Sequence, residues 1–99
     1  MVEQTQIDKW KKEHGKVYVA RPASDIEVYY RTLTREDYIN IMQESQTSLN
    51  MDPELKTVQL CVLHGFDIDS FTKRGGLTTV IYEDIMVKSG FVVIESEEL

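Results

Sequence analysis

Residues 16–31 read KVYVARPASDIEVYYR, and this stretch predicts the centre of the fold. Residues 16–20 and 26–31 are rich in β-branched and aromatic side chains, which favour strands. Between them, residues 21–25 supply the proline, serine and aspartate that are typical of a turn. The stretch therefore predicts a β-hairpin.

The tyrosines of this hairpin predict a binding surface. Because strand side chains alternate between two faces, Tyr18 and Tyr29 should lie opposite the sets Val17/Val19 and Val28/Tyr30. Whichever set covers the core then leaves aromatic surface outside. Exposed tyrosine is a common interface anchor, since a large apolar ring carries a polar tip. We predict a protein-binding surface on the hairpin and the start of the next helix, formed by Tyr18, Tyr29, Tyr30 and Arg31.

Two alternatives accompany this hypothesis. The first alternative is that these tyrosines, together with Tyr38, pack over a small hydrophobic core. A hairpin in a small domain also exposes an edge, which can accept a strand from a partner or from a second copy of the chain. Client binding and homo-oligomerisation are therefore both compatible with the pattern.

Helical patterns surround the hairpin. Residues 7–14 carry Ile7 and Trp10 three apart and are followed by a glycine, which predicts a short, partly exposed helix. A hydroxyl and a carboxylate spaced as in a capping box predict a helix from Thr34 to about Ser45. Asp-Pro-Glu at 52–54 predicts the start of a third helix, whose apolar face (Leu55, Val58, Cys61 and Val62) ends at Gly65.

The last helix is predicted over residues 77–89, because Gly90 stands at the capping position. Its β-branched residues would also suit a strand. We expect Val58 and Val62 of the third helix to face Ile81 and Ile85 of the last one. Residues 66–76 read as a surface loop with one turn of helix near Ser70.

At 99 residues the chain is long enough for one hydrophobic core and too short for two. We predict a single α+β domain over residues 1–99, a β-hairpin packed against a small bundle of three to four helices. Residues 1–6 form a polar N-terminus. Residues 91–94 are expected to dock or pair, and residues 95–99 form a solvated acidic tail.

The composition excludes several classes of function. A formal net charge of −6 and a pI near 4.8 oppose binding to nucleic acid. No stretch approaches the ~20 apolar residues of a membrane span, so we expect no membrane association. The single cysteine, Cys61, lies in an apolar run, which indicates a core position in a reducing, cytoplasmic compartment.

The sequence offers no constellation for catalysis or ligand binding. Cys61 and His64 lie one helical turn apart, but with His14 they are too few for a zinc site. Asp67 and Asp69 resemble the start of a calcium loop, yet the following positions lack its glycine and glutamate. No nucleophile stands beside a base, and the KRGG run at 73–76 lacks phosphate-loop spacing. We expect no catalytic residue, no metal and no cofactor.

Four segments carry a resemblance to a known family: WKKEHGKVY at 10–18, YYRTLTREDY at 29–38, CVL at 61–63 and SGF at 89–91. Together they resemble the small tail assembly chaperones of tailed bacteriophages. The resemblance implies a non-enzymatic helper in the cytoplasm of the infected bacterial host. It would keep the aggregation-prone tape-measure protein soluble and recruit tail-tube subunits. A minor structural component of the tail or baseplate, and a small regulatory protein that binds a host enzyme, remain alternatives.

Overall fold

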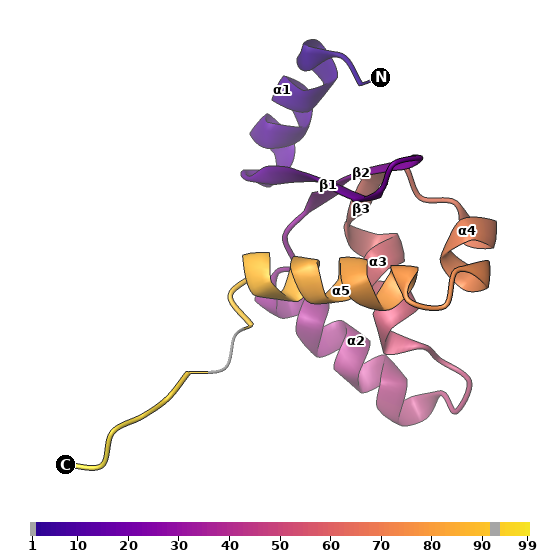
Figure 1. Cartoon of the computed structure of the whole chain (residues 1–99). Coiled ribbons are helices and arrows are strands. Elements are labelled where there is room, and N and C mark those ends of the chain that lie inside the picture. Colours follow the sequence, from indigo (N-terminus) through magenta and orange to yellow (C-terminus); the bar gives the residue numbers. More distant parts are fainter. Residues whose placement is uncertain (1, 92–93) are drawn as a thin grey trace.

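The computed structural model describes residues 2–91 and 94–99 of the chain. Its elements follow one another in the order α1 (Gln4–His14), β1 (Val17–Ala23), β2 (Ile26–Arg31), α2 (Arg35–Thr47), α3 (Pro53–Cys61), β3 (Val62–His64), α4 (Ile68–Lys73) and α5 (Leu77–Lys88) (Figure 1). The predicted α+β class and the hairpin are confirmed. The first helix begins at Gln4, three residues before the predicted start at Ile7.

The hairpin belongs to a three-stranded antiparallel sheet with the order β1-β2-β3. Strand β1 runs through the predicted turn as far as Ala23, with an irregularity in the pairing between Ala20 and Ala23. Only Ser24 and Asp25 separate the two strands of the hairpin. In the described part of the chain, β1 has no neighbouring strand on its far side.

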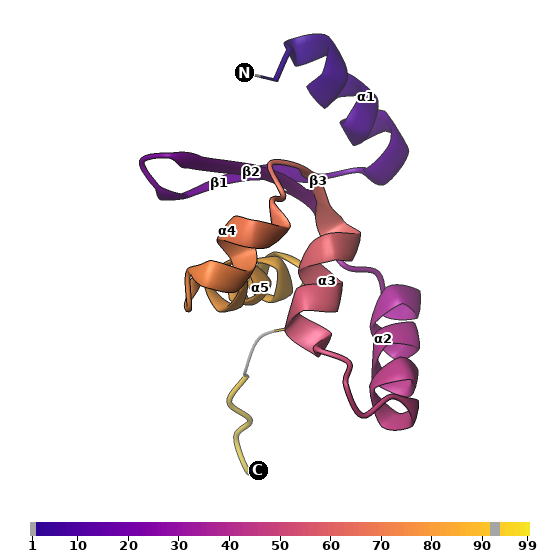
Figure 2. The same cartoon turned by 90° about the vertical axis from the view of Figure 1, so that its right-hand side faces the viewer.

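Helices cover the sheet unequally (Figure 2). Helices α3, α4 and α5 lie on one side of the sheet, and α1 lies on the other. The main core therefore forms beneath one face, which we call the core face. Tyr18 of β1 is paired with Tyr30 of β2, and Ala20 with Val28; these four side chains belong to the core face. Val19 and Tyr29 are paired on the opposite, outer face.

The expected contact between the third and last helices is confirmed for Val58, Ile81 and Ile85, which share one fully buried cluster. The expectation that Val62 belongs to the third helix is wrong. Val62 has an extended backbone, begins β3, pairs with Tyr30 and is half-buried. A strand pair joins segments far apart in the sequence, so helical spacing alone extended this helix too far.

Gly65 ends β3 at a position that only glycine suits. Its φ is +97°, and a Cβ built there would lie 2.2 Å from the carbonyl oxygen of Glu27. The turn after β3 thus passes directly against the backbone of β2. Gly65 had been expected to end a helix, but it allows this close approach instead.

Residues 66–76 contain more structure than the single turn that was predicted. Asp67 caps the six-residue helix α4 by accepting a hydrogen bond from the Asp69 backbone, and Phe71 is buried in the core. The acidic pair considered as a calcium loop therefore serves helix capping. At the other end of the chain, Phe91 packs against Tyr38 with 4.7 Å between ring centroids. The rest of the predicted docking segment lies partly outside the described residues, and residues 94–99 are exposed.

Candidate functional site

The structure buries Tyr29 and Tyr30, two of the four predicted binding residues. Tyr30 is fully buried on the core face and donates its hydroxyl hydrogen bond to Asp84 of α5. Tyr29 is on the outer face but only 8% exposed. Trp10 of α1 and His64 of β3 cover it, with ring centroids 5.9 and 6.0 Å away. The expectation that one tyrosine face would stay open is therefore wrong for Tyr29, because α1 folds over that face.

Arg31, the third predicted residue, stabilises the fold through hydrogen bonds of its side chain. Its guanidinium donates hydrogen bonds to the Thr32 carbonyl and to the Asp37 carboxylate, and its side chain is only 14% exposed. Asp37 in turn completes the capping box of α2 with Thr34. Burial opposes ionisation of Asp37, but hydrogen bonds from Arg31 and Thr34 outweigh it and lower the pKa of the carboxyl group. Arg31 thus joins the end of β2 to the start of α2.

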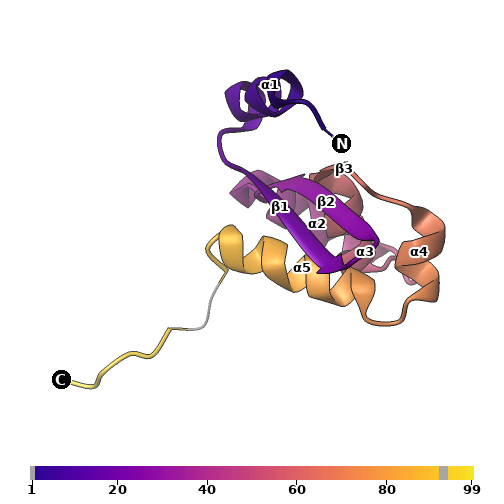
Figure 3. The same cartoon turned by 45° about the horizontal axis from the view of Figure 1, so that its top comes forward.

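Tyr18, the fourth, borders an open groove between β1 and α5. It is half-buried, stacks on Tyr30 with 5.7 Å between centroids, and lies beneath the Lys88 ammonium group at 5.8 Å. Figure 3 shows β1 at the edge of the sheet beside α5. The hollow between them, which we call the β1–α5 groove, has a volume of about 560 Å³. Tyr18 is the one predicted residue that a partner could reach there without opening the fold.

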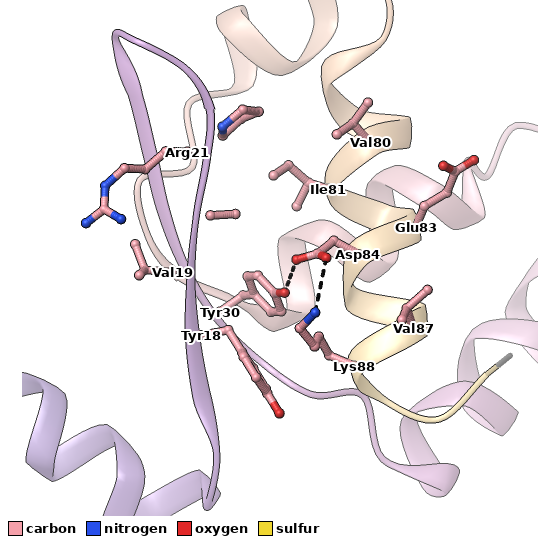
Figure 4. A pocket seen from close by; sticks show the side chains of 12 residues that line it. Tyr18, Val19, Arg21, Tyr30, Val80, Ile81, Glu83, Asp84, Val87 and Lys88 are labelled. Atoms are coloured by element: carbon pink, nitrogen blue, oxygen red, sulfur yellow. Dashed lines mark hydrogen bonds and ion pairs between the residues drawn. The ribbon is translucent and has the colours of Figure 1, made fainter.

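Helix α5 is apolar on more than one side, which is unusual for a helix at a surface. Leu77, Ile81 and Ile85 recur every four residues and are buried. Val80 and Val87 are also apolar, yet each is 52% exposed at the rim of the groove (Figure 4). A surface helix normally presents polar side chains opposite its buried stripe. The two valines extend the apolar surface of α5 from the core out to the groove.

Charged groups border this apolar rim. Asp84 accepts the hydrogen bond from Tyr30 and lies 3.7 Å from the Lys88 ammonium group (Figure 4). Burial of the Tyr30 hydroxyl, together with this carboxylate, raises the pKa of Tyr30. Glu83 stands next to the valines, and within the described chain no cation pairs with it. The groove thus combines an apolar rim, one carboxylate without a cation partner, Glu83, and a strand edge that no other strand pairs with in the described residues.

The groups considered for catalysis and metal binding are arranged for packing. Cys61 is fully buried, and burial raises the pKa of its thiol to about 11. His64 packs against Trp10 on the outer face, with centroids 6.5 Å apart, so Cys61 and His64 belong to different layers. Among residues 2–91 and 94–99, no cluster of three or more potential metal ligands is found.

Sequence reasoning missed Val80, Glu83 and Val87. One signal was present: α5 contains more apolar residues than a single buried stripe needs. That these extra apolar residues lie beside β1 depends on packing between segments about 60 residues apart.

No described helix is long and apolar enough to cross a membrane. Comparisons with protein-family models, with curated proteins and with solved structures each find no match.

Proposed function

We propose that this chain is a non-enzymatic assembly chaperone of a tailed bacteriophage, which binds the tape-measure protein in the host cytoplasm and brings tail-tube subunits to it. The resemblance of four segments to such chaperones supports the biological context. The β1–α5 groove is the observation that carries the proposal, because a chaperone needs an accessible apolar surface for its client.

The electrostatics of the chain suit this task. Its formal charge of −6 keeps chaperone molecules apart while each presents apolar groups. The exposed valines at the groove rim are few and are flanked by Glu83, which limits self-aggregation. A complex with an aggregation-prone client would gain solubility from the acidic body.

The test is co-expression with fragments of the tape-measure protein from the same phage. The Val80→Ser/Val87→Ser double variant should keep the wild-type fold by circular dichroism and lose most of its ability to keep the client soluble. Serine has a helix propensity close to that of valine, so helix α5 should persist. Ile68→Ser on α4 is the matched control, since Ile68 is also exposed, at 47%, but lies outside the groove. It should behave like the wild type.

Three results would contradict the proposal. If the wild-type protein leaves every tape-measure fragment insoluble, the tape-measure protein is not its client. Stoichiometric copies of the chain in purified virions, measured by mass spectrometry, would instead indicate a structural component of the tail or baseplate. A pull-down from infected cells that recovers a host enzyme and no tail protein would point to a regulatory role.

A further inference from the structure

We propose that the β1–α5 groove binds its client by strand addition: an extended client segment pairs with the free edge of β1 and places alternating apolar side chains on Val80 and Val87. This inference rests on the proposed function for the identity of the client. Three features of the groove favour this mode of binding: the free edge of β1, the apolar rim of α5 and the charge of Glu83.

The backbone of β1 lies at the edge of the sheet. An edge strand presents N–H and C=O groups that no neighbouring strand satisfies, and within residues 2–91 and 94–99 nothing pairs with the far side of β1. Pro22 has no N–H, so pairing on this edge is best supported over residues 17–21. A partner of about five extended residues would match this length.

Helix α5 lies beside the edge of β1. An added strand would lie about 4.8 Å beyond β1, and every second side chain would point to the core-face side. There the neighbours are Tyr18 and Ala20 of β1, and Val80 and Val87 on the rim of α5. Apolar side chains at alternating positions of the client would cover this rim, while the intervening side chains would lie beside Val19 on the outer face.

The charges of the groove favour a client segment that carries a cation. Glu83 flanks the valines one helical turn from each, with no cation beside it in the described structure. Asp84 is already engaged by Tyr30 and Lys88. A client segment with one lysine or arginine on its groove-facing side would therefore complement the site. A second copy of the chain fits less well, because two molecules of formal charge −6 repel each other.

The experiment uses a synthetic seven-residue peptide in which valine alternates with threonine and one valine is replaced by lysine. In an added strand, the amides of every second residue face β1 and the others face solvent. Two variants of the peptide, one N-methylated on the odd residues and one on the even residues, should therefore differ in affinity. One should lose about tenfold or more in affinity, and the other should stay within about twofold of the parent.

Nuclear magnetic resonance on the labelled full chain supplies the second readout. Peptide binding should slow hydrogen exchange at alternate β1 amides, and the Val80→Ser/Val87→Ser variant should weaken binding by about tenfold. Glu83→Gln should reduce affinity for the lysine peptide and leave a peptide with valine at that position unaffected. Ile68→Ser should change neither measurement.

Several outcomes overturn the inference, and one overturns only the proposed function. Failure of the peptide to bind the folded chain, or equal affinity of the two methylated peptides, would rule out strand addition. Sedimentation showing a dimer of the free chain that Val80→Ser/Val87→Ser dissociates would assign the edge to a second copy. If tape-measure fragments bind independently of Val80 and Val87, strand addition in the groove is excluded, and the proposed chaperone function is still supported. Peptide binding without fragment binding would keep the strand site and remove the proposed client.

Discussion

Replacing Tyr30 with phenylalanine tests the link between the core and the groove. The hydroxyl of this fully buried side chain donates a hydrogen bond to the Asp84 carboxylate. Hydrogen bonds to charged groups contribute ~1.5–3 kcal/mol. Asp84 is half-buried and keeps Lys88 as a partner, so water and the ammonium group can replace part of the lost interaction. We expect Tyr30→Phe to lower the free energy of unfolding by about 1–2 kcal/mol.

Urea unfolding followed by circular dichroism measures this loss. For a domain of this size, the same change should lower Tm by roughly 4–8 °C per kcal/mol. Tyr18→Phe is the matched control: its ring stacks on Tyr30, but within the described residues no partner accepts a hydrogen bond from its hydroxyl. The control should stay within about 0.5 kcal/mol of the wild type.

Alkaline pH gives an independent check of the same contact. The pKa of Tyr30 is raised by burial and by Asp84, so this side chain binds its proton more tightly in the folded state than in the unfolded state. Its contribution is complete below the ordinary tyrosine pKa of about 10 and is lost as the pH rises above it. The wild type should therefore lose stability above about pH 10 more steeply than Tyr30→Phe. Equal stability of the two proteins at neutral pH, or parallel alkaline profiles, would refute the reasoning.

Three further experiments test the core and the turn after β3. Val58→Asp should abolish the cooperative melt because it buries an unpaired carboxylate, whereas Val62→Asp, at a half-buried position, should leave a destabilised but folded protein by circular dichroism. Gly65→Ala should cost several kcal/mol in urea unfolding, since its Cβ would collide with the backbone of β2, and Gly75→Ala should be close to neutral. Cys61 should react with a thiol reagent at neutral pH only as fast as the protein opens, because its thiol is buried and its pKa is raised to about 11; rapid labelling of folded protein would contradict this.

Local signals explain why much of the fold could be predicted. The turn chemistry between residues 16–20 and 26–31 is confirmed by the hairpin. The caps at Thr34 and Asp52 are both present, each accepting backbone hydrogen bonds at the start of its helix. These features act over a few residues, so they can be recognised in the sequence. Strand β3 depends on pairing with β2, more than thirty residues earlier, and helical spacing hid it.

The same distinction explains the outcome at the candidate site. Alternation along β2 correctly separates Tyr29 from Tyr30, but it does not show that α1 folds back over the outer face. Tyr29 is therefore covered by a helix that precedes it in the chain. The open edge of the hairpin was expected in general terms. Helix α5, which places apolar side chains beside this edge, comes from the other end of the sequence, so its position could not be predicted.

The valines of α5 give the strongest physical reason to place function in the groove. Serine or threonine at positions 80 and 87 would serve the helix about as well as valine, because their helix propensities are similar. The buried stripe of Leu77, Ile81 and Ile85 already attaches α5 to the core. Because Val80 and Val87 are each 52% exposed, the isolated fold gains only part of their burial energy, and stability alone gives a weak reason for both to be apolar. A partner strand on the β1 edge would supply a stronger one, since it would bury both side chains at once.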